Sequence, residues 1–298
     1  MQLSKMKDTL TGTLTVALIL CVACSLVVSA AAVMLKPGQE ANAALDQQKN
    51  ILDAAGLALG EYGRTASELS DAQIENLYSR VSEKMINLDD GTVNTDVDPK
   101  EFDLIAASQS AEYSKTFTEL RAADPEYAGP KFDFGEERKL EVTKVFFVTD
   151  ANGEQLTQVV LPIYGKGLWG TLYGYMALKS DLKTIEGITF YQHKETPGLG
   201  GEVDNPAWKK QWAGKHLYDE TGEPAAYVFK GAAPDDNVYA VDGLSGATIT
   251  SRGVTNLVQY WASEDGYKPF LATLKQKLES GDLEMIKRAP NTTETDNG

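Results

Sequence analysis

The segment DGLSGATITS at residues 242–251 places a turn of small residues directly before an apolar helical pattern. Apolar residues recur at helical spacing within 254–261, which predicts a helix over 250–261 with one face in a core. We expect Thr250 or Ser251 to cap this helix. Free backbone N–H groups and the positive dipole end attract anions at such a position. The segment therefore predicts either a phosphate-binding turn or an ordinary capped turn.

The run Ser245-Gly246-Ala247-Thr248 inside this segment resembles the (S/T)-G-A-T motif of the FMN-binding domain family. In that family the last threonine carries FMN through a phosphoester bond. The resemblance implies that Thr248 holds covalent FMN, with Ser245, Gly246 and Ala247 beside the phosphate. A flavin ring would also need an apolar slot, backbone hydrogen-bond donors and restricted access of solvent.

Two further segments have residues that suit a flavin ring. Residues 165–175, GKGLWGTLYGY, put Trp169 as a flat apolar wall among glycines between two predicted strands. Residues 193–202, HKETPGLGGE, form a loop that is entropically costly to order, so a fixed loop would lie against something specific. The alternatives are a strand–turn–strand crossing with a core tryptophan for the first segment and a mobile surface turn for the second.

In this order the three segments resemble the C-subunit family of the sodium-translocating NADH:quinone oxidoreductases. The resemblance implies a membrane-anchored electron-transfer subunit in a complex that oxidises NADH, reduces quinone and exports sodium. It implies partners, namely the other subunits and a flavin transferase, and it implies no catalytic residue in this chain. The residues implied for the ring and phosphate pocket are Trp169, Glu195, Thr196, Gly198, Leu199, Ser245, Gly246 and Ala247.

Two other functions fit the same segments. One is a flavoprotein similar to the G subunit of the complex that couples ferredoxin to NAD, which has a related flavin motif. The other is a non-catalytic binding or assembly module on a membrane anchor, in which the glycine loops serve only as turns. Bound flavin would separate the second of these from the electron carriers.

The N-terminal region predicts a single membrane anchor. No charged residue occurs from Thr9 to Leu35, and residues 14–35 would span roughly 33 Å as a helix. A cleaved signal peptide is the alternative, but its apolar region would be shorter. Flanking lysines give little bias in orientation, so the resemblance alone implies a bacterial inner-membrane protein with its large domain outside the cytoplasm. Cys21 and Cys24 are expected to be packing residues in the anchor, or to contact a metal centre or partner helix.

Composition and motif content exclude several functions. The 298 residues have a formal net charge of −15, which argues against nucleic acid as a partner. With His193 and His216 as the two histidines, we expect no metal site built on histidine, and each is expected to be a surface or hydrogen-bonding residue. The chain also has no Gly-x-Gly-x-x-Gly run at a βαβ unit and no P-loop.

The pattern along the chain predicts an α+β fold in five parts. They are a short tail (1–10), the anchor (11–35), a mainly helical region (36–139), a domain with a mainly antiparallel sheet flanked by helices (140–280) and a polar tail (281–298). The resemblance implies that the first of these parts is cytoplasmic and that the fourth is an FMN-binding domain. In the helical region Ser70 or Asp71 is expected to cap a helix that extends through Val81 and Met85.

Within the predicted domain, β-rich runs indicate strands and apolar periodicity indicates helices. A hairpin turn is expected at 150–153, because Asn-Gly favours such turns. Trp208 and Trp212 are expected to pack in the core, and Asp242 is expected to cap a turn or to assist the transferase's metal. The predicted strands are 142–148, 158–164, 174–178 and 185–192, and a last helix is predicted over 269–278.

Overall fold

A computed structural model describes residues 10–287, so the predictions for residues 1–9 and for the tail from 288 lie outside the described residues. The chain divides into two compact units between Gln48 and Lys49. Its helices are α1 (Leu10–Ala54), α2 (Leu57–Tyr62), α3 (Asp71–Tyr78), α4 (Leu104–Gln109), α5 (Phe117–Ala123), α6 (Pro206–Lys210), α7 (Thr248–Trp261) and α8 (Lys268–Ser280), with two short 3₁₀ turns, η1 (Ala66–Glu68) and η2 (Gly200–Asp204).

The main sheet of the second unit has six antiparallel strands in the order β2-β1-β5-β6-β7-β8. Two small sheets accompany it, an antiparallel pair of β3 and β4 and a parallel pair of β9 and β10. The strands are β1 (Val81–Asn87), β2 (Val93–Asn94), β3 (Ser114–Thr116), β4 (Arg138–Leu140), β5 (Val142–Thr149), β6 (Leu156–Lys166), β7 (Thr171–Lys179), β8 (Ile185–Gln192), β9 (Tyr227–Val228) and β10 (Ala240–Val241).

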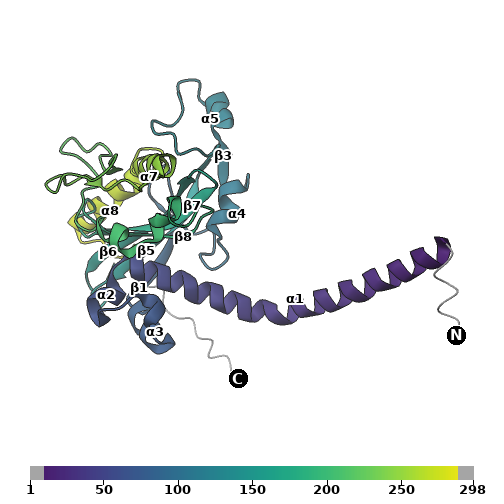
Figure 1. Cartoon of the computed structure of the whole chain (residues 1–298). Coiled ribbons are helices and arrows are strands. Elements are labelled where there is room, and N and C mark those ends of the chain that lie inside the picture. Colours follow the sequence, from purple (N-terminus) through teal and green to yellow (C-terminus); the bar gives the residue numbers. More distant parts are fainter. Residues whose placement is uncertain (1–9, 288–298) are drawn as a thin grey trace. The chain divides into compact units, whose positions relative to one another are not determined.

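Alternation along the strands supplies both faces of this sheet with apolar side chains. On β5, Phe147 belongs to the core that α7 and α8 cover (Figure 1). Its neighbour Phe146 belongs to a second core, together with Ile51 and Ala54 from the C-terminal end of α1. Because both faces are covered, the middle of β5, residues 145–148, is a continuous apolar run and not an alternating one.

Helix α7 lies unusually close to the backbone of β6. A Cβ atom on Gly253 would lie 2.2 Å from the Lys166 carbonyl oxygen, and one on Gly165 would lie 2.6 Å from the Leu257 side chain. At the C-terminal end of the helix, Trp261 Nε1 donates to the Tyr164 carbonyl oxygen at 2.7 Å. The Gly-Lys-Gly run at 165–167 therefore allows close packing of α7 on the sheet.

The predicted α+β architecture is confirmed, with the four predicted strands as β5 to β8 and the predicted hairpin turn between β5 and β6. Ser70 is the N-cap of α3, and its side chain accepts from the backbone N–H of Gln73. The predicted extension of this helix through Val81 and Met85 is wrong, because both lie in β1 and pair with β5. Apolar residues four apart on a strand share a face, so that spacing fits a strand as well as a helix.

Helix α1 is long and apolar enough to cross a membrane. It continues past the predicted anchor, through Pro37, to Ala54, and its residues from Lys49 onward belong to the second unit. Cys21 and Cys24 are exposed on α1 as free cysteines. The apolar helix is thus the N-terminal anchor candidate that the sequence predicts.

The close approach of α7 to β6 gives a testable consequence. Gly253→Ala should destabilise the protein by about 1–3 kcal/mol, because the added methyl group would overlap the Lys166 carbonyl oxygen. Urea unfolding of the full-length chain in detergent, followed by tryptophan fluorescence, measures this change. Gly60→Ala in α2 is the matched control, since its Cβ would meet nothing within 4 Å. Equal stability of the two variants would contradict this account of the packing.

Candidate cofactor site

The predicted phosphate-binding turn ends earlier in the chain than the sequence suggests. Helix α7 starts at Thr248, and its N-cap Ala247 makes no side-chain capping bond, so the expected capping by Thr250 or Ser251 is wrong. Gly246 has φ of 71°, a left-handed conformation that favours glycine. The turn therefore brings Thr248 into the first turn of the helix, where backbone N–H groups lack intrahelical partners.

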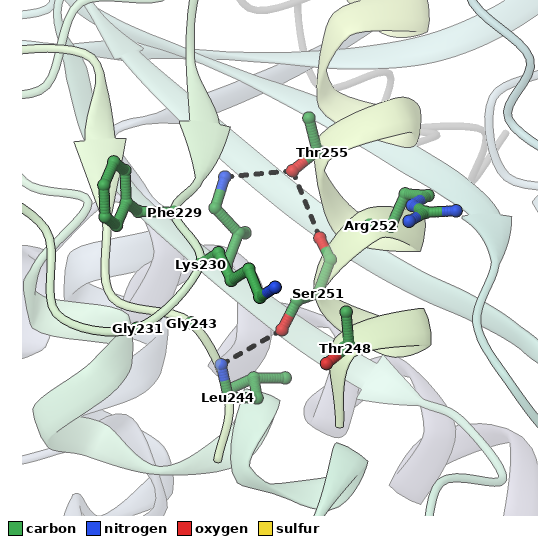
Figure 2. A pocket seen from close by; sticks show the side chains of 10 residues that line it. Phe229, Lys230, Gly231, Gly243, Leu244, Thr248, Ser251, Arg252 and Thr255 are labelled. Carbon is green, nitrogen blue, oxygen red and sulfur yellow. Dashed lines mark hydrogen bonds between the residues drawn. The ribbon is translucent and has the colours of Figure 1, made fainter. Parts of the chain in front are cut away.

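A cavity of about 270 Å³ opens beside Thr248. One wall is the α7 face that presents Thr248, Ser251, Arg252 and Thr255, residues that recur at helical spacing. The other walls are residues 228–231, which continue β9, and the turn residues Gly243 and Leu244 (Figure 2). Of the residues predicted for the site, Thr248 alone is among those that line this cavity.

Hydrogen bonds join these walls to the helix. Ser251 is buried, and its Oγ accepts from the Leu244 backbone N–H at 3.0 Å. The Thr255 hydroxyl accepts from the Val228 backbone N–H at 2.9 Å and donates to the Ser251 carbonyl oxygen at 3.1 Å. The Ser251 and Thr255 side chains of α7 thus accept from the backbone of the 242–251 turn and of β9. These hydrogen bonds hold the walls of the cavity in place.

Two cationic side chains, Lys230 and Arg252, line the cavity, and both are exposed. In Figure 2 the Lys230 side chain extends from the β9 side toward the face of α7 that holds Thr248 and Ser251. Together with the positive end of the α7 dipole, these two side chains make the surroundings of the Thr248 hydroxyl favourable for an anion. The exposed Thr248 side chain is accessible from solvent.

Glu195 connects the three segments that the sequence analysis singled out. Its Oε1 accepts from the Trp169 backbone N–H at 2.9 Å, and its Oε2 accepts from the Thr250 hydroxyl. Gly167 and Gly200 leave room for the carboxylate, because a Cβ on either would lie within 2.6 Å of one of its oxygens. Glu195 is 6% exposed and Thr250 is fully buried. Glu195 is thus an internal support of the site and not part of its surface.

The loop at 193–202 is fixed by internal hydrogen bonds. The Thr196 carbonyl oxygen accepts from the backbone N–H groups of Leu199 and Gly201, and His193 Nε2 lies 2.7 Å from an Asp204 carboxylate oxygen. The Leu199 side chain lies beside Gly246, since a Cβ there would be 2.9 Å from Leu199 Cδ2. These contacts argue against the mobile-turn alternative.

Apolar side chains are exposed around this junction. Trp169 is 65% exposed and Leu199 is 44% exposed, and Leu168 and Ile249 are also exposed. The alternative of a core tryptophan at position 169 is therefore wrong. All four residues belong to the three segments that meet at Glu195, so an apolar ligand next to Thr248 would find apolar surface to cover.

The remaining predicted site residues belong to the same turn and loop. Thr196, Gly198, Ser245 and Gly246 are exposed, whereas Ala247 is buried at the start of α7. Leu199 lies beside Gly246, and Glu195 bonds to Thr250, so the 193–202 loop and the 242–251 turn lie together. None of these residues contributes an ionisable side chain to the predicted site.

The start of the 242–251 turn is stabilised by side chains that pack or bond around Asp242, among them Trp208. Trp208 and Trp212 are both buried, as expected for core residues, and Trp208 Nε1 donates to the Asp242 carbonyl oxygen at 2.7 Å. The Asp242 carboxylate accepts from the Ala233 backbone N–H and from Gln211 Nε2. Asp242 therefore joins two neighbouring segments to the turn, and its carboxylate does not cap the 242–251 turn as one expectation had it.

Sequence reasoning missed Lys230, Arg252 and Thr255. Arg252 and Thr255 follow Thr248 at helical spacing, so a helix projected from Thr248 would have found both of them. Lys230 lies 18 positions before Thr248 and reaches the cavity through the β9–β10 pairing, a contact that no local pattern reveals. Within residues 10–287, no group of three or more His, Cys, Asp or Glu side chains is placed to hold a metal ion.

The two serines of the turn differ in burial, which gives a prediction. Ser251→Ala should lower the free energy of unfolding by about 1–3 kcal/mol, because the buried Leu244 N–H would lose its acceptor. Ser245→Ala, the control at the exposed serine, should stay within about 0.5 kcal/mol of wild type. Urea unfolding of the full-length variants in detergent measures both, and a larger loss for Ser245→Ala would contradict the assignment.

Comparison with known proteins is consistent with a cofactor site here. A model of the FMN-binding domain family matches residues 167–263, a range that contains Trp169, Glu195 and Thr248. The C subunit of the Na(+)-translocating NADH-quinone reductase of Pseudomonas aeruginosa is 42% identical over 274 residues, covering 91% of this chain and 98% of that protein. The corresponding protein of Yersinia pestis is 41% identical over 269 residues, covering 90% and 94%.

A solved structure agrees with the fold. The crystal structure of Shewanella oneidensis NqrC superposes with a TM-score of 0.66 at 34% sequence identity, and the match covers 77% of this chain and 96% of that one. Similarity therefore extends over the sheet and the helices that position the site, and it is not limited to short motifs.

Proposed function

We propose that this chain, which belongs to the family of C subunits of the Na(+)-translocating NADH-quinone reductases, carries FMN on Thr248. It is the membrane-anchored flavin electron-transfer subunit of such a complex, so its partners are the other subunits. The relatives are named for the quinone enzyme, which favours this function over the ferredoxin-linked alternative.

One observation supports the attachment residue above all. Thr248 is an exposed hydroxyl residue in the first turn of α7, at the edge of a cavity lined by Lys230 and Arg252. A phosphodiester bears one negative charge, which the two cationic side chains and the helix dipole would neutralise. Thr250 and Ser251 are buried and already bonded to Glu195 and Leu244, so Thr248 is the hydroxyl of this helix turn that suits modification.

The surrounding residues suit the rest of the cofactor. FMN would supply a ring that accepts and releases electrons. Trp169, Leu168 and Leu199 offer exposed apolar surface that the ring would cover. Thr196, Gly198 and Ser245 are exposed in the same loop and turn, and their backbone groups would face the polar atoms of the ring. The protein thereby binds and orients the ring and limits the access of water to it.

Covalent attachment and sidedness complete the proposal. A flavin transferase forms the phosphoester bond, and the bond keeps the cofactor at a high effective concentration beside its partners. The large domain lies on the extracytoplasmic side of the bacterial inner membrane, where released FMN would be lost by dilution. The long apolar helix α1 supports a single anchor for this arrangement.

Removing the attachment hydroxyl tests the proposal. The full chain is expressed with a flavin transferase and run on a denaturing gel, and flavin fluorescence of the protein band is recorded. Wild type should fluoresce and Thr248→Ala should not, because the phosphoester has no oxygen to form on. Thr248→Ser keeps a hydroxyl and should retain some fluorescence, and Ser245→Ala is the control for a neighbouring hydroxyl. Fluorescence of Thr248→Ala equal to wild type would refute the attachment residue.

The cavity cation gives a second prediction. Lys230→Glu should slow the initial rate of flavin incorporation about fivefold or more, the size of effect that a partly screened charge pair supplies. Lys275→Glu makes the same change in net charge on the exposed side of α8 and serves as the control. The two rates are measured from the same gel fluorescence over time. If both variants incorporate flavin at one rate, Lys230 plays no part in attachment.

A further inference from the structure

We propose that the buried carboxylate of Glu195 holds down the reduction potential of the flavin. This inference rests on the proposed function, and it gives Glu195 a role different from that of a residue that contacts the ring. Glu195 acts through its charge and through the two segments it joins, as a positioning residue.

Hydrogen bonds satisfy both side-chain oxygens of Glu195. Both of its oxygens accept, one from a backbone N–H and one from the Thr250 hydroxyl. Among residues 10–287, no lysine, arginine or histidine side chain forms an ion pair with it. The adjacent Lys194 is exposed, and His193 accepts from the Glu195 backbone N–H and directs its other nitrogen to Asp204. The charge is therefore buried without a cationic partner in this part of the chain.

The position of Glu195 explains how a buried charge is tolerated there. Thr250 lies in the first turn of α7, where the helix dipole stabilises a negative charge. The two hydrogen bonds replace water at both oxygens. Burial also reduces screening, so the field of the carboxylate acts on neighbouring groups more strongly than that of a surface residue.

The same position makes the flavin ring sensitive to that field. Glu195 bonds directly to the backbone of Trp169, the proposed wall of the ring site, and to Thr250, two residues after the attachment threonine. Two-electron reduction with uptake of one proton from water adds one negative charge to the ring. The electrons come from the NADH-oxidising complex. A fixed negative charge nearby disfavours this change, so it lowers the reduction potential.

Glu195→Gln separates charge from structure. The glutamine oxygen can accept from the Trp169 N–H, and its amide can donate to the Thr250 oxygen, so both contacts survive without the charge. We expect the midpoint potential of the flavinylated full chain, measured by spectroelectrochemical titration in detergent, to rise. The expected change is at least tenfold in the reduction equilibrium, which is about 30 mV for a two-electron couple.

Asp204→Asn is the matched control. It removes one negative charge from the same region, but from a carboxylate that is 52% exposed and bonded to His193. Solvent screens this charge, so its removal should change the potential less than Glu195→Gln does. Equal potentials for the two variants would contradict a specific effect of the buried carboxylate.

Glu195→Asp provides the converse test. The shorter side chain keeps the charge but cannot maintain both contacts, so this variant should unfold at lower temperature while its potential stays within about 30 mV of wild type, less than a tenfold change. Glu195→Gln should show the opposite pattern, a changed potential with a nearly unchanged melting temperature. Potentials that follow the melting temperatures in both variants would mean that Glu195 is only a structural support.

Flavin loading separates failure of this inference from failure of the function. A wild-type band without flavin fluorescence would remove the proposed function and this inference with it. A loaded wild type beside an unloaded Glu195→Gln variant would overturn only the inference, because the isosteric side chain keeps both hydrogen bonds. A loaded Glu195→Gln variant with unchanged potential would do the same.

Discussion

The site depends on the close contact between α7 and β6. Gly253 lets the helix backbone approach the Lys166 carbonyl oxygen, and Trp261 donates to the Tyr164 carbonyl oxygen further along the helix. The helix is thus fixed on the strand at two places, and its first turn is held at the end of β6. The loop that contains Trp169 begins at this same strand end, so one packing contact sets the distance between the turn and the loop.

Within the first turn of α7, helix geometry separates the proposed attachment residue Thr248 from Thr250, the partner of Glu195. Successive residues are about 100° apart around a helix, so Thr248 and Thr250 point to nearly opposite sides. Thr248 is exposed beside the cationic cavity, and Thr250 is buried against Glu195. The phosphoester that we propose and the buried carboxylate would therefore share the positive end of α7 without direct contact. Lys230 and Arg252 supply the additional positive charge that a second anion requires.

Much of the fold could be predicted from the sequence because strands β5 to β8 are β-rich and a strong turn signal separates β5 from β6. The strand β1 could not, since Val81 and Met85 repeat at a spacing that fits either structure, and its partner β5 lies more than fifty residues away. The start of α7 was placed too late because hydroxyl residues usually cap helices, whereas here Thr250 and Ser251 bond to other segments. The motif selects Glu195 for the ring and phosphate pocket, whereas its burial and its two contacts follow from tertiary packing that no motif encodes.

The central claim is that Thr248, and no other hydroxyl of the 242–251 turn, holds the flavin. Trypsin cleavage after Lys230 and Arg252 yields one peptide, residues 231–252, that contains every hydroxyl of this turn. Tandem mass spectrometry of this peptide from the flavinylated full chain is the most direct test. We predict a mass increase equal to FMN less water, with fragment ions that assign it to Thr248. An unmodified peptide from a preparation that contains flavin, or a modification on Ser245, Thr250 or Ser251, would contradict the account.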